Sequence, residues 1–234
     1  PQSIGDREAQ KPPEESRMAA TVTDEEAHAF ADQLLEARRS GVPIPAFTET
    51  RPELGLDDGY AIQRHLVNRL LAEGEVISGY KLGLTSLAMQ ELLKVDQPDF
   101  GPVFATGVFP DGTALAVDRF IAPRIEAEIA VVLGEELAGP GCTETEARRA
   151  TRGLVAALEI VDSRVRDWRI RIADTVADLA SGGAIALGSQ MVPVSGLEPR
   201  LIGMVFSCNG DTVATAAGAA ALGDPMTAVA WLAN

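Results

Sequence analysis

The chain has 234 residues, of which 46% are hydrophobic and 5% aromatic, so it is long enough to form one domain with a substantial core. Its 34 acidic residues outnumber 20 basic ones, and the net charge of -14 makes nucleic acid and anionic membranes poor partners. The sequence contains no run of 18 apolar residues and no signal-peptide pattern, so we expect a cytoplasmic protein with no membrane partner.

The N-terminal part is predicted to be helical after a polar, proline-rich tail at residues 1–17, which we expect to be disordered. Thr23 and Glu26 form a capping box, and a helix is expected from there to about residue 39. A second helix is predicted at about residues 58–73, because apolar side chains recur at i, i+4 spacing. We expect residues 18–75 to form a small helical region.

The remainder of the chain, residues 76–234, has the sequence pattern of a β-rich domain. Short apolar runs alternate with glycine, proline and aspartate, which is typical of strands and turns. Because helices come first and strands follow with brief helices, the order predicts an α+β fold. The last helix runs to Asn234 without a cap, so the natural C-terminal end is expected to lie further on. Strands are predicted at 76–84, 103–109, 113–117, 125–133, 154–161 and 184–188, short helices at 87–93, 143–152 and from 224, a turn at 96–101, and a hairpin at Asn209-Gly210.

Histidine and cysteine are scarce, which limits the chemistry that the chain can perform. Cys142 and Cys208 fit no metal-binding or disulfide spacing, so we expect free thiols. His28 and His65, the two histidines of the chain, lie in segments with helical periodicity. Acid–base or metal chemistry must therefore depend mainly on carboxylates, lysine or hydroxyl groups, and the sequence argues against a Ser-His-Asp site.

Three glutamates on two apolar strands are the candidate metal ligands. Alternation along 125–133 places Glu126 and Glu128 on one face, where two neighbouring negative charges repel each other. A solvated face at a sheet edge would also explain this pair. Glu159 lies within the apolar run 154–161, where its carboxylate must pair with a base, hold a proton or bind a metal. Together the three carboxylates suit Mg²⁺ or Mn²⁺, and the absence of histidine and thiol ligands argues against zinc.

Five other polar residues are candidates for the same site or for structural roles. Lys81 lies in the apolar run 76–84 between glycines, and is either at a sheet edge or buried and functional. Asp99 belongs to the turn signal DQPDFG, so it has a turn-forming interpretation as well as a functional one. Ser181, before Gly182-Gly183, is either a cap or a ligand-binding hydroxyl. Asp162 and Arg164 are expected to form a structural ion pair.

Six segments at these residues resemble one enzyme group in the same order along the chain. They are similar to the 2-keto-4-pentenoate hydratase and 4-oxalocrotonate decarboxylase group of the fumarylacetoacetate hydrolase superfamily, and the resemblance covers residues 27–234. The segments are GYKLGLTS (79–86), VDQPDFG (95–101), PRIEAEIAVVLG (123–134), ALEIVDSR (157–164), DWRIRIADTVADLASGG (167–183) and AGAAALGDP (217–225).

The resemblance implies a fold, a metal site and a reaction. It implies a mixed β-sandwich roll, a homo-oligomer, and small 2-oxo or 2-hydroxy-enoic acids from aromatic ring cleavage as substrates. Glu126, Glu128 and Glu159 match the ligands of Mg²⁺ or Mn²⁺. Lys81 and Asp99 match acid–base positions, and a further match places Ser181 in the substrate pocket.

The sequence leaves three functions open. The first is a hydratase acting on 2-hydroxypenta-2,4-dienoate or a relative, which the PDFG and DWRIRIADTVAD segments favour. The second is a 4-oxalocrotonate-type decarboxylase, and the third is a non-catalytic member of the fold. The group usually has asparagine where Leu179 stands and continues beyond Asn234, and both differences favour the third interpretation.

Overall fold

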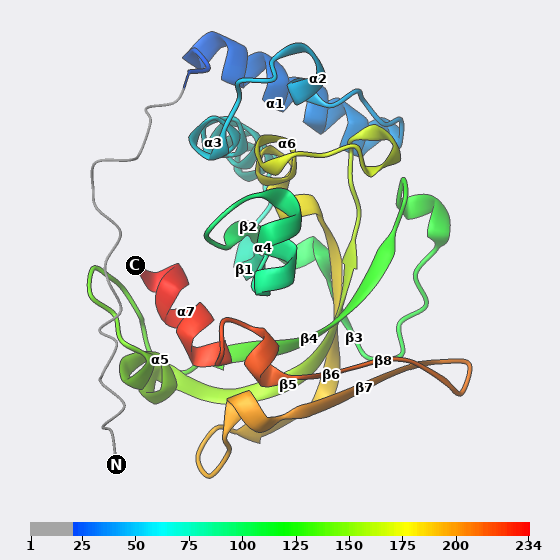
Figure 1. Cartoon of the computed structure of the whole chain (residues 1–234). Coiled ribbons are helices and arrows are strands. Elements are labelled where there is room, and N and C mark those ends of the chain that lie inside the picture. Colours follow the sequence, from blue (N-terminus) through cyan, green and yellow to red (C-terminus); the bar gives the residue numbers. More distant parts are fainter. Residues whose placement is uncertain (1–20) are drawn as a thin grey trace.

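A curved sheet, a central strand pair and a layer of helices make up the structure, a computed structural model that describes residues 21–234 (Figure 1). The proline-rich tail predicted at residues 1–17 lies outside the described residues. The helices α1 (Asp24–Ser40) and α3 (Leu56–Ala72) lie at one end of the molecule, and the curved sheet bends around the central strand pair (Figure 1). Within the described residues, no helix is long and apolar enough to cross a membrane.

The two predicted N-terminal helices are confirmed as α1 (Asp24–Ser40) and α3 (Leu56–Ala72), and a short helix, α2 (Phe47–Thr50), lies between them. Thr23 and Glu26 form the predicted capping box of α1. Gly41 ends the helix with φ 68°, a left-handed conformation that glycine adopts without steric cost.

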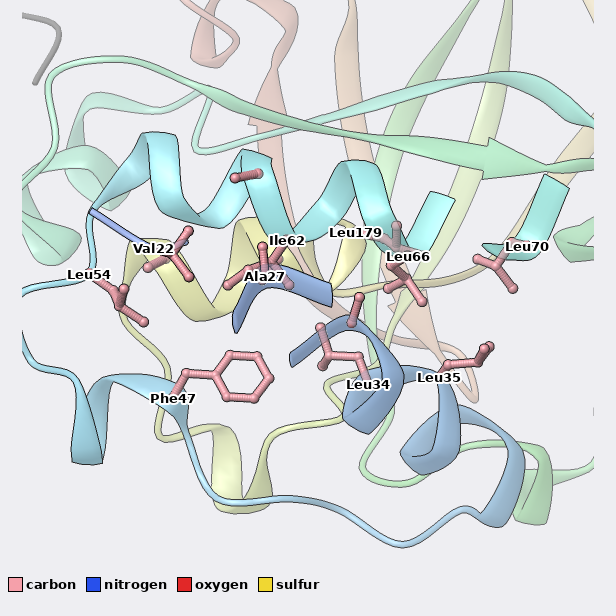
Figure 2. Packing of buried hydrophobic residues seen from close by; sticks show 14 of the residues in the cluster. Val22, Ala27, Leu34, Leu35, Phe47, Leu54, Ile62, Leu66, Leu70 and Leu179 are labelled. Atoms are coloured by element: carbon pink, nitrogen blue, oxygen red, sulfur yellow. The ribbon is translucent and has the colours of Figure 1, made fainter. Parts of the chain in front are cut away.

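The main hydrophobic core lies between these helices and α6 (Ile172–Ala177) (Figure 2). Leu34 of α1 and Ile62 of α3 are fully buried there, as expected for the apolar faces of amphipathic helices. Leu179, which follows α6, belongs to the same cluster (Figure 2), and the turn that contains it also contacts β1 and β2.

Asp58, in the first turn of α3, holds the N-terminal segment against this core. Its carboxylate accepts hydrogen bonds from the amides of Val22 (2.7 Å) and Gly55 (2.8 Å), and also from Thr21. Burial raises the pKa of Asp58, but the hydrogen bonds from Gly55, Val22 and Thr21 outweigh it and hold that pKa below its usual value.

Asp58→Asn is expected to lower the free energy of unfolding by about 2 kcal/mol at pH 7, because amide hydrogen bonds to a charged carboxylate are lost. The pKa of Asp58 is lower in the folded than in the unfolded protein. The stabilisation that its carboxylate contributes is therefore fully present above the unfolded pKa of about 4, and it is lost as the pH falls through the pKa of the folded state. Urea denaturation at several pH values should therefore show the difference shrinking in acid. Asp57→Asn is the control; a similar loss there would contradict the assignment.

The curved sheet contains four strands in the order β3-β6-β5-β4. The strands β4 and β5 are antiparallel, as are β5 and β6, whereas β3 runs parallel to β6. The predicted strands at 125–133 and 154–161 are confirmed, and the one predicted at 184–188 is longer than expected. The bounds are β3 (Val108–Pro110), β4 (Arg124–Leu133), β5 (Thr151–Val161) and β6 (Gly182–Pro193).

The central pair consists of β1 (Ile77–Gly83) and β2 (Asp99–Phe104), which run antiparallel, with α4 (Leu87–Leu93) between them in the chain. The prediction that Asp99 lies in a turn is wrong, because Asp99 is the first residue of β2 and pairs with Gly83. Pairing with β1 overrides the local turn preference of the DQPDFG segment. Ser86 caps α4 as predicted.

The rest of the β-rich part follows the predicted pattern with two exceptions. The single strand predicted at 103–109 is wrong, because a 3-10 turn at Ala105–Gly107 separates the end of β2 from β3. The Asn209-Gly210 hairpin is confirmed, and both residues have positive φ (53° and 93°), as a type I′ turn requires. The strand predicted at 113–117 is wrong, because this segment has no partner strand and leads into a 3-10 turn at Val117–Arg119. The other elements are α5 (Glu144–Ala150), β7 (Gly203–Cys208), β8 (Asp211–Ala217) and α7 (Pro225–Ala233).

Candidate functional site

A buried ion pair joins the central strands to the curved sheet. Lys81 of β1 places its Nζ 3.3 Å from Oε1 of Glu159 on β5, and the two side chains are only 9% and 6% exposed. The same Nζ donates a 2.8 Å hydrogen bond to the carbonyl oxygen of Ala180. Burial lowers the pKa of Lys81, but the carboxylates of Glu159, Asp99 and Glu126 outweigh this and keep it above its usual value. The lysine side chain is therefore buried and charged, not solvated.

Asp99 lies on the same face of the central pair as Lys81. Its partner in the register is Gly83, two residues from Lys81, so the two side chains are diagonal neighbours. A Cβ atom at Gly83 would lie 2.1 Å from Oδ1 of Asp99, so any larger residue at this position would displace the carboxylate. Burial raises the pKa of Asp99, and its buried Oδ1 finds no hydrogen-bond partner within the described part of the chain. Such an atom is suited to accepting a proton or a ligand hydrogen bond.

The register of β4 and β5 brings the predicted carboxylates to one face. Glu126 pairs directly with Glu159, and Glu128 follows two residues along the same face. Glu159 is buried, whereas Glu126 and Glu128 retain surface that is accessible to solvent. Glu128 keeps part of its side chain in contact with solvent, but the surrounding protein desolvates its carboxyl. This desolvation, with Glu159 and Glu126 nearby, raises the pKa of Glu128 to about 7.

The donor set and charge of this cluster fit a hard divalent cation. Among the described residues, no three His, Cys, Asp or Glu side chains already form a group that would hold a metal ion, and Glu159 is paired with Lys81 instead. The shared face nevertheless holds oxygen ligands alone, which Mg²⁺ and Mn²⁺ prefer. Four neighbouring carboxylates face one lysine, and burial together with the charges of Glu159 and Glu126 raises the pKa of Glu128. A divalent cation would neutralise that excess.

Ser181 lies in the turn that follows α6, directly after Ala180, whose carbonyl oxygen accepts the hydrogen bond from Lys81. Its Oγ is 3.0 Å from Oγ1 of Thr175, and the residue is buried. The structure therefore brings Ser181 next to the carbonyl that holds Lys81, but its hydroxyl is engaged with Thr175. A substrate contact through Ser181 stays a prediction.

The expected ion pair between Asp162 and Arg164 is only marginal, at 4.0 Å. The principal partner of Arg164 is Asp178, and Asp162 instead accepts hydrogen bonds from the amides of Ile121 and Ala122. Asp178 was not singled out in the sequence because a carboxylate at the end of a short helix is usually solvated. Its chain separation from Arg164, 14 residues, gives no periodic signal.

A small cavity is lined by Lys81 and Glu159 at one end and by the last turn of α1 at the other. Its lining includes Lys81, Glu159, Phe104, Leu179 and, at α1, Arg38. The guanidinium of Arg38 forms no hydrogen bond or salt bridge with the part of the chain that the structure describes, and burial lowers its pKa. Sequence reasoning missed Arg38, because a basic residue in the last turn of a helix normally interacts with the helix dipole.

Comparisons with known proteins agree with the motifs. Residues 82–234 match the family described as fumarylacetoacetate (FAA) hydrolase C-terminal. A 2-keto-4-pentenoate hydratase from Paraburkholderia xenovorans (strain LB400) is 42% identical over 213 residues, covering 91% of this chain and 79% of that protein. A 2-hydroxypent-2,4-dienoate hydratase from Pseudomonas putida is 41% identical over 206 residues, covering 88% of this chain and 93% of that protein.

A solved structure shares the arrangement of most of the chain. The 4-oxalocrotonate decarboxylase from Pseudomonas putida G7, complexed with magnesium and adipate, has a TM-score of 0.88 and 34% sequence identity. The similarity covers 92% of this chain and 82% of that one. The fold therefore occurs in a protein of known structure that binds a divalent cation together with a dicarboxylate.

Proposed function

Because the chain belongs to the fumarylacetoacetate hydrolase family, we propose that it is a metal-dependent hydro-lyase that adds water to 2-hydroxypenta-2,4-dienoate or a related 2-oxo-enoic acid. The observation that carries this proposal is the Lys81–Glu159 pair, buried against Asp99 on one side and the carboxylates of β4 on the other. In this proposal the acid–base groups and the metal ligands share a single site.

Glu126, Glu128 and Glu159 would hold Mg²⁺ or Mn²⁺. A divalent cation supplies Lewis-acid stabilisation of negative charge on an oxygen of the bound 2-oxo acid. Glu159 also keeps Lys81 in place, so one carboxylate connects the metal ligands to the acid–base residues.

Lys81 and Asp99 perform the proton transfers in this proposal. The ammonium Nζ of Lys81 donates a proton or a hydrogen bond to the substrate, since its raised pKa keeps it charged near neutral pH. Oδ1 of Asp99 has no hydrogen-bond partner among residues 21–234, so it is available to accept a proton or orient the attacking water. Ser181 is proposed to contact the substrate after its hydroxyl leaves Thr175.

Decarboxylation is the second candidate, because a 4-oxalocrotonate decarboxylase shares the fold with a TM-score of 0.88. Both reactions place developing negative charge on the 2-oxygen, so the same carboxylates serve either one. They differ in product, since only the decarboxylase releases CO₂. A non-catalytic role is the third candidate and predicts no turnover with either substrate.

The deciding experiment follows the ultraviolet absorbance of 2-hydroxypenta-2,4-dienoate with purified protein and Mg²⁺, and then with a chelator. Metal-dependent loss of the diene band, with hydrated product and no CO₂, is the expected result. If the diene persists but CO₂ is released from 4-oxalocrotonate, the decarboxylase proposal replaces the hydratase. Lack of turnover of both substrates, with Mg²⁺ present, would overturn both enzymatic proposals.

The proposal extends to the architecture, location and oligomeric state that the resemblance implies. We propose that the strands form a mixed β-sandwich roll over residues 76–234, with residues 18–75 as a helical region covering the site, in a cytoplasmic protein. We also propose a homo-oligomer. Ile125 and Leu158, on the face of the curved sheet opposite the carboxylates, support it because they are 54% and 38% exposed despite being apolar.

Arg38 is proposed to attract the acidic substrate into a protein whose net charge is -14. Arg38→Met is expected to raise KM about tenfold, the effect of losing one charge-assisted hydrogen bond, with kcat within about twofold of wild type. Arg39→Met is the control, because Arg39 is exposed and paired with Glu73. Equal KM values in the two variants would show that Arg38 only packs.

A further inference from the structure

The turn that receives the hydrogen bond from Lys81 has a rare backbone conformation. Leu179, Ala180 and Ser181 all have positive φ, at 57°, 51° and 53°, and none of them is glycine. Side chains with a Cβ are disfavoured in this left-handed region, and three in succession persist only where the surroundings fix them. Neighbouring groups must therefore hold the turn 179–181 in this conformation.

Arg164 bridges the two ends of this turn. Its Nη2 donates to the carbonyl of Asp178 at 2.8 Å, and its Nη1 donates to the carbonyl of Gly182 at 3.0 Å. The Nε of Arg164 also donates to Oδ1 of Asp178, and its backbone amide donates to Oδ2 at 2.8 Å. Both residues are almost completely buried, so their guanidinium and carboxylate are held in one geometry.

The central strands are shaped to receive the turn. Gly101 pairs with Lys81 in the register of β1 and β2, and a Cβ atom at Gly101 would lie 2.3 Å from the carbonyl oxygen of Leu179. The missing side chain therefore lets the turn lie against β2, opposite Lys81. This places the carbonyl of Ala180 at 2.8 Å from Nζ of Lys81.

We propose that Arg164 and Asp178 are positioning residues for Lys81, acting through the left-handed turn 179–181. Neither residue contacts Lys81 directly in the structure. They fix the direction of the Ala180 carbonyl, and that carbonyl fixes the ammonium beside Glu159. The inference rests on the proposed function for its kinetic consequence, because Lys81 is the acid–base residue there.

Asp178→Asn tests the proposal, since asparagine keeps the volume of the side chain but not the charge that Arg164 requires. At equal folded fraction, kcat is expected to fall about 10- to 100-fold, the usual effect of losing a residue that orients a reactive group, with KM and Mg²⁺ affinity within about threefold of wild type. Arg164→Lys should reproduce the loss, because an ammonium does not form the same fork to Asp178 and Gly182. This second variant is measured in place of the first if Asp178→Asn does not fold.

Asp174→Asn is the matched control. Asp174 is as buried as Asp178 and lies four residues earlier, but its carboxylate accepts from Thr48 and from the amide of Arg171, away from the turn. It is expected to lower stability without lowering kcat. Equal kcat in Asp174→Asn and Asp178→Asn, at equal folded fraction, would overturn the proposal.

A crystal structure of Asp178→Asn separates this inference from the proposed function. The turn and Nζ of Lys81 are expected to move together, so that the bond to the Ala180 carbonyl is lost, whatever the reaction of the protein. A turn that changes while Lys81 keeps its place would overturn the positioning role. Absence of turnover in wild-type protein would instead contradict the proposed function alone.

Discussion

Glu159→Gln is expected to abolish metal-dependent turnover and to weaken Mg²⁺ binding by more than about 100-fold. Even residues that only orient metal ligands contribute about 10- to 100-fold to affinity, so a direct ligand should contribute more. The neutral amide also removes the ion pair with Lys81, which lies 3.3 Å from the carboxylate. Both the metal site and the acid–base residue are therefore affected by one substitution.

The same variant is expected to remain folded. Breaking a buried ion pair usually costs about 3–5 kcal/mol, because the remaining charge is left uncompensated. Lys81 keeps its hydrogen bond to the Ala180 carbonyl and still has the carboxylates of Asp99 and Glu126 nearby, so a smaller cost is expected. Circular dichroism and urea denaturation should show a native spectrum and a cooperative transition.

Calorimetric titration with Mg²⁺ and the diene assay measure the two expected losses. Glu135→Gln is the control, because Glu135 lies on the exposed segment just after β4 and changes the net charge by the same amount. Full metal-dependent turnover of Glu159→Gln would show that the assignment of Glu159 as a metal ligand is wrong.

The sequence predicts the three candidate metal ligands because the apolar run around Glu159 and the alternation along 125–133 are local patterns. A glutamate inside an eight-residue apolar run is conspicuous, and Glu159 is indeed buried. Alternation placed Glu126 and Glu128 on one face. The pairing of Glu126 with Glu159 depends on the register between β4 and β5, which no local pattern specifies, and only the structure provides it.

The errors arise where long-range pairing decides the outcome. Asp99 was predicted to lie in a turn because aspartate and proline favour turns, yet β1 supplies a partner and the segment becomes a strand. The run 113–117 has the composition of a strand but no partner, and Val117 remains 75% exposed. Arg164 was paired with the nearest carboxylate in sequence, whereas the fold brings Asp178 to it.

Lys81→Met is expected to lower kcat by about 100- to 10,000-fold, the range that general acid–base groups contribute. Methionine preserves much of the buried aliphatic stem, so the change removes mainly the ammonium and its bonds to Glu159 and the Ala180 carbonyl. The carboxylates that would hold the metal all remain. Mg²⁺ affinity should consequently change much less than kcat, in contrast to Glu159→Gln.

The comparison of these two variants distinguishes the role of Lys81 from that of the metal ligands. Lys94→Met, at the exposed end of α4, is the control for loss of a lysine charge and should leave both quantities unchanged. If Lys81→Met retains the wild-type kcat, the lysine only neutralises Glu159, and the acid–base function must belong to Asp99 alone. If Lys81→Met weakens Mg²⁺ binding as strongly as Glu159→Gln does, Lys81 maintains the metal site. The proposal that Lys81 acts in proton transfer and Glu159 in metal binding is then wrong.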